Sequence, residues 1–568
     1  MGQTNSAKTQ KATIPTSADL KLPGAIGAGL LVIIMGVVRC IALDSDAYGR
    51  LSWSAALLTD EGYYIHNARN LVLFGQMRTD GFNNALIMPT LHYLQVAVFS
   101  HFGVGAIQAR MISVVLSLLT LLIFAIALNR AFGGRVALLG TLFLGLDHVH
   151  FLYNRMALMD TPAAFVMVCS FAAWVESVRA ERRQEAWLLL CGLLLGLAFA
   201  TRGLSALLIP VPLLLAWRRA ERGPGRWRGS VALGAGLGAA LALYIGCWYL
   251  PHRGELGQIN HYYLTRQLLP SSFGQFAHQM GNALFGDDRG FSPYLFRHTP
   301  ILFLLALAWI AWRLVAPRRQ AADPADANAD FLGGWLLAAW VVLAVIGYAP
   351  SRYYVLFYPA LAGIAALALV QGGAIWETMG SHRGMRAALG GFVVYHLLTT
   401  AFHPVRAAGV GGIWALALGA GAALWRIPLP TGRGVKVAGA VALTLWGLIN
   451  GGWTLDWLTH LTYTQRDADR YLAQRLPPNS VLLGDVAPGL CLNNRFRCVN
   501  VIPGLCNDER PIEQFSPAPC YIIILDGRFK EYYWRKNYPQ YVVPSRRAAL
   551  LPRIIRYDVG VYRVNTGA

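Results

Sequence analysis

Asp60 and Glu61 form an acidic pair just after the first long apolar stretch, within Thr59-Asp60-Glu61-Gly62-Tyr63-Tyr64. That stretch, 24–38, follows a lysine-bearing N-terminus and ends in Arg39. Two carboxylates beside a membrane are costly to bury, so we expect them to face a water-filled cavity or to bind a polar group. A carboxylate there can deprotonate an acceptor hydroxyl. A solvated pair of loop carboxylates is the alternative.

Four further clusters of charged and aromatic residues stand at the expected outer ends of apolar stretches. They are His148-Val149-His150-Phe151-Leu152-Tyr153-Asn154-Arg155 with Asp160, Thr201-Arg202-Gly203, His261-Tyr262-Tyr263-Leu264-Thr265-Arg266, and Ser351-Arg352-Tyr353-Tyr354. Because all lie on one side of the predicted topology, they can converge with Asp60 on one cavity. Arginine offers a forked cation to phosphate oxygens, so the clusters predict a site for a phosphate-bearing lipid.

The predicted roles follow from residue type. Asp160 joins Asp60 and Glu61 as a catalytic candidate. The candidates for holding the lipid phosphate and its isoprenoid head are Arg155, Arg202, Arg266, Arg352, Tyr353 and Tyr354. Plainer interpretations stay open: Arg155 with Asp160 as an interfacial ion pair, and Arg202 snorkelling to headgroups. Arg352 with its tyrosines could equally be an aromatic-belt anchor.

Other polar residues of the outer segments could line the same cavity. The candidates are Tyr63, Arg69, His148 and His261. His148 and His150 together suggest a metal, but His-x-His without a placed third ligand favours ordinary loop histidines. The sequence therefore leaves a divalent cation open as a cofactor and requires none.

The composition shows what must position these residues. The chain has 568 residues, of which 55% are hydrophobic and 14% charged, and its mean hydropathy is +0.42. Soluble domains carry roughly a quarter charged residues, so the sequence predicts a mainly α-helical, polytopic membrane protein. About 13 spans can be placed, at 24–43, 108–128, 134–151, 161–178, 186–201, 203–217, 230–250, 299–315, 331–349, 353–372, 387–402, 408–425 and 434–452. The tight connection inside 186–217 would also fit one re-entrant hairpin.

The net charge of +20 follows the predicted membrane topology of the chain. Basic residues gather in alternating inner segments, as the positive-inside rule describes, and attract anionic lipid. Nucleic acid is therefore not an expected partner, whereas the lipid bilayer is. Residues 1–23 are predicted to be cytoplasmic and to precede an uncleaved anchor. An odd number of spans then places the C-terminus outside.

Two long outer segments interrupt the predicted transmembrane domain, 24–452. The first, 44–106, contains amphipathic stretches at 61–74 and 85–102 that are too polar to span, as in helices lying in the interface. The second is 251–298. We expect both to cover the cavity.

From 453 to 568 the composition changes to that of a small extracytoplasmic α/β domain. A helix is predicted at 466–475 and strands at 480–483, 521–525 and 556–564. Neither Gly-x-Gly-x-x-Gly nor a P-loop is present, so nucleotide binding has no support. The cysteines Cys491, Cys498, Cys506 and Cys520 suggest two disulfides, with neighbour pairing the simplest of three pairings. Zinc is the alternative, although the spacing has no Cys-x-x-Cys.

The sequence resembles the GT-C membrane glycosyltransferases, which include protein O-mannosyltransferases and lipid A aminoarabinose transferases. The resemblance covers about 24–375 and rests on Asp-Glu after the first span, Asn-Arg-x4-Asp, Thr-Arg-Gly and Ser-Arg-Tyr-Tyr-x4-Pro, in that order. It implies transfer of a sugar from a polyprenyl phosphate to an extracytoplasmic acceptor, with inversion at the anomeric carbon. It also implies that Asp60 is catalytic and that basic residues of the other loops bind the lipid phosphate.

One departure concerns the second amphipathic stretch. Aminoarabinose transferases have an acidic residue and a lysine before Pro-Pro there, whereas this chain has Leu86-Ile87-Met88-Pro89-Thr90. The phosphate-binding lysine and the metal-binding glutamate of that subgroup are missing. Arg69, Arg78 or Arg266 could substitute for the lysine.

The sequence thus predicts a multi-pass glycosyltransferase of the bacterial inner membrane that builds a cell-envelope glycolipid such as lipopolysaccharide, a polysaccharide or a glycoprotein. A lipid-linked oligosaccharide flippase or ligase is one alternative, and a non-catalytic assembly scaffold is another. A transporter places ionisable groups near the membrane midplane, whereas here they gather at the outer ends of spans, which favours the enzyme.

Overall fold

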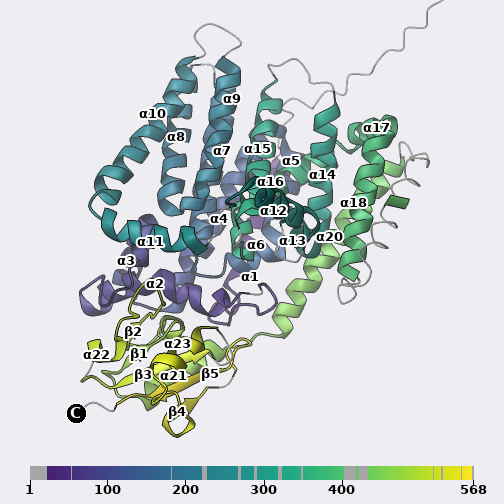
Figure 1. Cartoon of the computed structure of the whole chain (residues 1–568). Coiled ribbons are helices and arrows are strands. Elements are labelled where there is room, and N and C mark those ends of the chain that lie inside the picture. Colours follow the sequence, from purple (N-terminus) through teal and green to yellow (C-terminus); the bar gives the residue numbers. More distant parts are fainter. Residues whose placement is uncertain are drawn as a thin grey trace, which may run out of the picture.

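The computed structural model describes residues 22–52, 54–180, 182–220, 227–266, 270–286, 291–316, 323–346, 349–401, 418–419, 433–515, 517–525, 529–551 and 553–565. Helices make up most of this chain, and a small sheet domain lies at one end of the helical body (Figure 1). The layer between the two is formed by the segment 44–106, which carries Asp60 and keeps here its predicted name, the first outer segment.

Apolar helices form the membrane part. They are α1 (Leu22–Cys40), α4 (Ala106–Phe132), α5 (Gly134–Leu146), α7 (Asp160–Arg179), α8 (Gln184–Thr201), α9 (Pro210–Ala220), α10 (Trp227–Tyr244), α14 (Pro300–Val315), α15 (Pro324–Val345), α16 (Tyr358–Val370), α17 (Gly372–Ser381), α18 (Arg383–Ala401) and α20 (Arg433–Thr459). Helix α4 is strongly apolar and 27 residues long. At 1.5 Å per residue its length is about 40 Å, which exceeds the thickness of the hydrocarbon core of a bilayer, roughly 30 Å. Such helices give the chain a multi-pass membrane character.

The number of spans differs from the prediction. Among the described residues, six helices are long and apolar enough to cross a membrane, or seven if α16 and α17, which meet at 76°, form one span. The apolar helices Gly29–Cys40, α5 and α14 are shorter, because turns and short helices take residues from the predicted spans. Thirteen spans are therefore not confirmed. The predicted span 408–425 lies outside the described residues, apart from 418–419.

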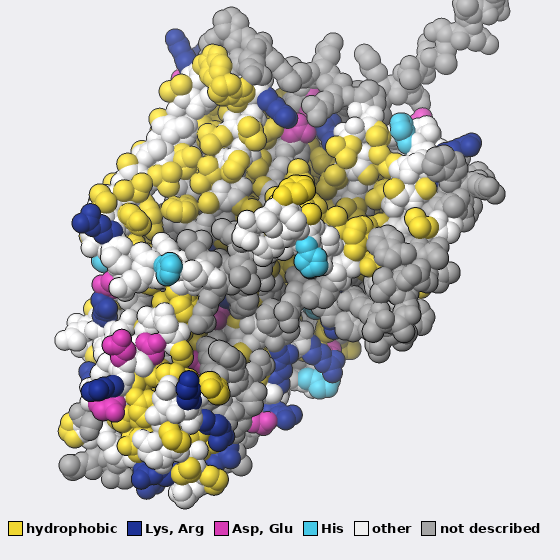
Figure 2. All heavy atoms as spheres, viewed as in Figure 1, with side chains coloured by type: hydrophobic (Ala, Val, Ile, Leu, Met, Phe, Trp, Pro, Cys, Tyr) yellow, Lys and Arg dark blue, Asp and Glu magenta, His cyan; other side chains and the backbone are white. Residues whose placement is uncertain are grey.

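Two glycines explain the close packing of α8 and α10. A Cβ added to Gly192 would collide with the backbone of Leu233, and one added to Gly236 with the backbone of Leu189. Small residues allow helix backbones to approach closely where lipid supplies no hydrophobic driving force. Outward-facing Leu243 and Leu337 are exposed, and apolar side chains cover the helical body in Figure 2, while charged side chains gather mainly on the sheet domain.

The first outer segment folds into α2 (Ala56–Phe74), the short helix η1 (Asn84–Ile87) and α3 (Pro89–Phe102). Helices thus cover most of both predicted amphipathic stretches. Helix α2 ends at Gly75, whose φ of 72° is left-handed and favours glycine. The second outer segment contains α11 (Arg253–Arg266), α12 (Phe273–Phe285) and α13 (Phe291–His298).

Short helical segments connect the spans at the level of the first outer segment. They are α6 (His148–Tyr153), η2 (Gly203–Leu208), the π-helical η3 (Ile245–Tyr249) and η4 (Ser351–Leu356). Prolines at 210 and 359 lie in the first turns of α9 and α16, just after two of these segments, because proline suits the first turn of a helix.

The sheet domain has five strands in the order β2-β1-β3-β5-β4. Its elements are α21 (Thr464–Arg475), β1 (Val481–Leu483), η6 (Ala487–Leu490), β2 (Arg497–Val499), α22 (Pro511–Phe515), β3 (Cys520–Leu525), α23 (Phe529–Asn537), η7 (Pro544–Arg546), β4 (Arg547–Leu550) and β5 (Val559–Arg563). Strands β2, β1 and β3 run parallel, and β5 and β4 add an antiparallel edge. The expected helix and three expected strands correspond to α21, β1, β3 and β5, whereas β2 and β4 were not predicted.

The cysteines form one of the two expected disulfides. Cys491 is bonded to Cys498, at the start of the loop before β2 and in β2 itself. Cys506 is not joined to Cys520: the Cys506 thiol donates to the Asn500 carbonyl and the Cys520 thiol to the Ala518 carbonyl. The second disulfide was therefore wrong, because the two thiols contact different backbone carbonyls, Cys520 at the first residue of β3 and Cys506 in the loop after β2.

Polar contacts fasten the sheet domain to the first outer segment. Asp46 accepts hydrogen bonds from Thr464 and Gln465 at the start of α21. At the other end, Asn507 donates to Asp80. A Cβ on Gly62 would collide with the backbone at Gly489, so α2 lies directly against η6. The sheet domain therefore covers the helix that bears Asp60.

Candidate active site

Asp60 pairs with Arg352 at the centre of the outer segments. Asp60 lies in the second turn of α2, and Arg352 lies in η4, nearly 300 residues later. Arg352 Nη1 stands 2.8 Å from Asp60 Oδ2, and the two residues are only 6% and 8% exposed. Thr59 Oγ1 lies 3.4 Å from the other carboxylate oxygen. The pair is therefore held in a nearly water-free environment.

A second ion pair stands next to the first. Asp160, the first residue of α7, pairs with Arg202, which ends α8, and both are buried. The ring of Tyr353 lies under both guanidinium groups, 4.4 Å from Arg202 Cζ and 5.2 Å from Arg352 Cζ. We call Asp60, Asp160, Arg202 and Arg352 the charged quartet. Four segments far apart in sequence supply it.

Tyrosines surround the charged quartet. Tyr153 and Ser351 share a hydrogen bond of 2.5 Å, which ties α6 to η4. Tyr354 stacks on Tyr294 of α13 with ring centroids 4.2 Å apart. Tyr64 is buried one turn beyond Asp60. These rings exclude water and leave the charged groups to interact with one another.

The electrostatics of Asp60 suit a proton acceptor. Burial raises the pKa of the Asp60 carboxyl, Arg352 opposes that rise, and the nearby Asp160 adds to it. The quartet contains two carboxylates and two guanidinium groups, so its charges balance. An incoming phosphate would attract the two arginines away from the two aspartates, since charge-assisted bonds to phosphate oxygens compete directly with those to carboxylates.

Glu61 does not face the quartet. Arg110 of α4 binds it with two bonds, Nε to Oε1 at 2.8 Å and Nη2 to Oε2 at 2.5 Å. The Ala157 backbone N–H donates to the same Oε1 at 2.8 Å. Both oxygens of Glu61 are occupied by structural donors that hold α2 in place, whereas the sequence predicted a catalytic role for this residue beside Asp60.

Arg155 also lies away from the quartet. Its guanidinium donates to the carbonyls of Arg39 and Ala42, at 2.6 Å and 2.8 Å, and lies 4.5 Å over the ring of Trp457. Burial lowers the pKa of Arg155 to about 10. It therefore binds the C-terminal end of α1 and has no forked face left for a phosphate, and it does not pair with Asp160.

The remaining cavity candidates serve other contacts. Arg69 donates to the carbonyls of Asn494 and Phe496 at 2.9 Å and 2.8 Å, and so holds the sheet domain. The Tyr63 hydroxyl donates to the Asp485 carbonyl at 2.8 Å. Neither Arg69 nor Tyr63 points its polar group at the quartet, because both groups donate hydrogen bonds to backbone carbonyls of the sheet domain.

Two candidate histidines are also separate from the quartet. His148 contacts Asn450 of α20 at 3.0 Å and stacks on Trp453, and burial lowers its pKa to about 4. His261 is exposed on α11. Arg266 ends α11, and its side chain lies outside the described part of the chain.

A resident metal has no obvious ligand set here. Within the described residues, no three His, Cys, Asp or Glu side chains come together as a metal site would require. The carboxylates of the quartet are instead balanced by arginines. The quartet therefore offers two buried carboxylates beside two fixed cations.

Arg110 is the important residue that the sequence reasoning overlooked. It lies at the start of α4, where the sequence indicates a membrane span, and it is buried. Its Nη1 also donates to the carbonyls of Leu43 and Ser45. A lone arginine in an apolar stretch was the available signal, because such a charge needs a partner.

Comparison with known proteins agrees with this architecture. Residues 87–222 match the family of dolichyl-phosphate-mannose-protein mannosyltransferases, and this segment includes Asp160 and Arg202. The fold is similar to the crystal structure of ArnT from Cupriavidus metallidurans bound to undecaprenyl phosphate, with 19% identity, a TM-score of 0.54, and coverage of 96% of this chain and 99% of that chain. ArnT from the same organism in the apo state is similar to the same degree, with 18% identity, a TM-score of 0.54, and coverage of 94% of this chain and 98% of that chain.

No match arises in a sequence comparison with curated proteins. The family match and the structural similarity nevertheless confirm the resemblance to GT-C glycosyltransferases that the motifs indicated.

Proposed function

We propose, from the resemblance to GT-C glycosyltransferases, that this chain transfers a sugar from a polyprenyl-phosphate donor to an acceptor hydroxyl outside the cytoplasm, with inversion. The observation that carries the proposal is the buried Asp60 carboxylate beside Arg352 and a second Asp–Arg pair. A base beside two cations matches a reaction in which a proton is taken from one group while negative charge develops on another.

The proposed reaction is a single displacement. Asp60 takes the proton of the acceptor hydroxyl while that oxygen forms a bond to the anomeric carbon. The bond between the anomeric carbon and the phosphate oxygen breaks, and the polyprenyl phosphate leaves with its electron pair. Arg202 and Arg352 stabilise the phosphate, and Tyr353 keeps both guanidinium groups in place.

The position of the charges supports an enzyme over a flippase. The quartet residues lie in α2, in η4 and at the ends of α7 and α8, and not in the middle of spans. Substrate sites of transporters lie near the membrane midplane. Charged groups at the ends of spans suit chemistry on a lipid headgroup.

The proposal extends to the setting of the reaction. We assign residues 24–452 to the catalytic membrane domain and 453–568 to an extracytoplasmic domain that presents the acceptor. The membrane would be the bacterial inner membrane, with the N-terminus cytoplasmic and the sheet domain periplasmic. Undecaprenyl phosphate is the carrier found in the ArnT structure of similar fold, which makes it the first donor lipid to test.

The experiment is a transfer assay with the full chain in lipid nanodiscs. A panel of undecaprenyl-phosphate sugars is supplied with envelope glycolipids, polysaccharides and proteins, and products are identified by mass. A sugar-bearing acceptor together with released undecaprenyl phosphate supports the proposal. Absence of both transfer and donor hydrolysis throughout the panel, with donor lipid bound, would favour a scaffold.

Arg202 and Arg352 are expected to set donor affinity. Replacing either by alanine removes a charge-assisted bond to phosphate worth about 1.5–3 kcal/mol, which is roughly 10- to 100-fold in affinity. Lysine keeps the charge but loses the fork, so its effect should be smaller. Binding of undecaprenyl phosphate is measured by native mass spectrometry.

The matched control for these variants is Arg155→Ala, because the guanidinium of Arg155 binds backbone carbonyls. Its folded fraction should bind the donor with the affinity of the unsubstituted protein. If Arg155→Ala weakens donor binding and the Arg202 and Arg352 variants do not, the phosphate site lies elsewhere.

Transfer should also fall in acid at a higher pH than an exposed aspartate would cause. Asp60 must be ionised to accept a proton, and burial raises its pKa above the ordinary value of about 3.9. As pH falls through this raised pKa, kcat/KM is lost. Because Arg352 opposes the rise, Arg352→Ala should move the acid limb to still higher pH. A profile of kcat/KM that stays flat down to about pH 4 would contradict this assignment.

A further inference from the structure

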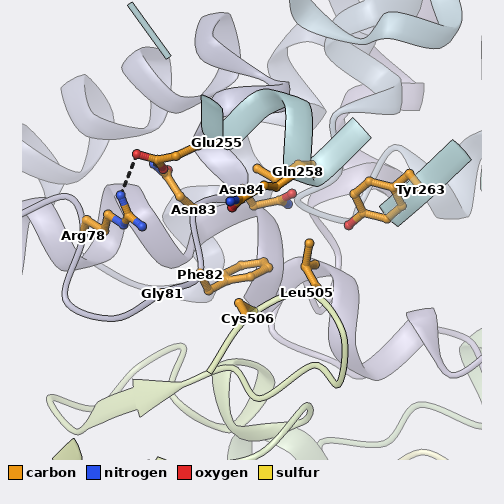
Figure 3. A pocket seen from close by; sticks show the side chains of 11 residues that line it. Arg78, Gly81, Phe82, Asn83, Asn84, Glu255, Gln258, Tyr263, Leu505 and Cys506 are labelled. Atoms are coloured by element: carbon orange, nitrogen blue, oxygen red, sulfur yellow. Dashed lines mark hydrogen bonds and ion pairs between the residues drawn. The ribbon is translucent and has the colours of Figure 1, made fainter. Parts of the chain in front are cut away.

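A small pocket lies where three parts of the chain meet. The segment 78–84, which follows α2, forms one side, α11 forms another, and residues 505–506 of the sheet domain close it. Figure 3 shows Asn83, Asn84 and Gln258 gathered between Phe82 and α11. The pocket is partly open, and its volume of about 40 Å³ has room for a few water-sized groups, such as the hydroxyls on one edge of a ring.

The lining of this pocket is polar but carries no uncompensated charge. Arg78 and Glu255 neutralise each other at 2.7 Å. The other polar lining groups are the amides of Asn83, Asn84 and Gln258, which both donate and accept hydrogen bonds, and the Tyr263 hydroxyl. Amides suit hydroxyl groups, and the rings of Phe82 and Tyr263 suit the apolar C–H face of a sugar. A phosphate would require an available cation instead.

One lining group is left without a partner. Asn83 is buried, and its Nδ2 donates to Glu255 Oε2 at 3.3 Å. Its Oδ1 is buried too, and no donor within the described residues reaches it. An unsatisfied buried acceptor costs free energy, so a ligand hydroxyl that donated to Oδ1 would remove this cost.

The pocket adjoins the charged quartet. Tyr263 interacts electrostatically with Asp60, Tyr353 and Arg352. On the other side, the Phe82 ring packs against Tyr63, one turn along α2 from Asp60, with centroids 5.6 Å apart. A group held in the pocket would therefore lie beside the proposed base.

We propose that this pocket binds a neutral, hydroxyl-bearing sugar ring during transfer. The proposal rests on the glycosyltransferase function above and deepens it. The same chemistry could come from two sources, the sugar of the donor or a sugar of the acceptor. In both cases Asn83 and Gln258 bind hydroxyls, while Phe82 and Tyr263 contact the ring.

The test is saturation-transfer NMR on the full chain in detergent, with neutral methyl hexosides as probes and methyl hexuronosides as charged counterparts. The neutral probes should receive saturation, and Gln258→Leu should weaken their binding about tenfold, as expected for one or two lost hydrogen bonds. Gln258 is exposed on α11, so this change should not disturb folding. The matched control is Asn260→Leu, also exposed on α11 but not in the pocket.

Preloading separates the two sources. If undecaprenyl-phosphate hexose displaces the methyl hexoside and undecaprenyl phosphate does not, the pocket holds the donor sugar. If the methyl hexoside binds alongside the loaded donor, the pocket holds the acceptor sugar. Equal binding to the unsubstituted protein and Gln258→Leu, or preference for the hexuronoside, overturns the proposal.

These readouts do not depend on turnover. Sugar binding that Gln258→Leu weakens, in a protein that shows no transfer, would retain the pocket and reject the enzymatic function. If the protein transfers sugar but Gln258→Leu leaves its sugar binding unchanged, the enzymatic function is retained and the pocket proposal is rejected.

Discussion

Replacing Asp60 by asparagine is expected to lower the rate of sugar transfer by a factor of about 10² to 10⁴, the usual cost of losing a general base. The amide cannot accept the acceptor proton at neutral pH, yet it has nearly the same shape. Because the substitution removes the carboxylate that competes for Arg352, donor binding should persist or become tighter. The measurements are kcat in nanodiscs and the affinity for undecaprenyl phosphate.

The control for this substitution is Asp558→Asn, which makes the same chemical change at an exposed ion pair with Arg553. It should leave both quantities unchanged. Near-normal kcat in Asp60→Asn would remove Asp60 from the reaction. A loss of donor binding equal to the loss of rate would instead make Asp60 part of the donor site only.

The fold was predictable where one physical pattern acted alone. Long apolar helices such as α4 and buried strands such as β3 are visible in the sequence because nearly every position must be apolar. The edge strand β4 was not, because Arg547–Leu550 is only four residues long and includes two alanines, and its pairing with β5 is interrupted by a register shift. The predicted number of spans is not confirmed, because short helices such as η2 and η4 take up residues that the sequence assigned to spans.

The site was predictable in residue type and only partly in arrangement. Short motifs drew attention to Asp160, Arg202 and Arg352, and the structure brings these residues together with Asp60. The same reasoning placed Arg155 with them, although its guanidinium donates to a backbone carbonyl at the C-terminal end of α1. Sequence patterns show that a buried charge needs a partner, but the partner is chosen by tertiary packing.

Glu61 illustrates this limit most clearly. Neighbouring residues on a helix point about 100° apart, so an Asp-Glu pair cannot direct both carboxylates at one substrate. Asp60 faces η4 and the quartet, whereas Glu61 faces α4 and the 157 backbone. The pair therefore divides into one carboxylate that faces the quartet and one that fixes the helix bearing both.

Glu61→Ala and Arg110→Ala are each expected to destabilise the folded protein by about 3–5 kcal/mol, because either change leaves a buried charge without its partner. Both side chains are nearly inaccessible, at 1% and 5% exposure. The double variant should lose less than the sum of the two single losses, since no lone charge remains. Unfolding in detergent, followed by tryptophan fluorescence, measures these differences.

Activity per folded molecule distinguishes this role from catalysis. Glu61→Gln retains an acceptor for Arg110 and for the Ala157 N–H, so its folded fraction should transfer sugar far faster than Asp60→Asn. The shift in α2 that follows loss of the ion pair would appear as a changed donor affinity together with a lower unfolding temperature. A Glu61→Gln variant that is fully stable and yet as inactive as Asp60→Asn would show that Glu61 takes part in the reaction itself.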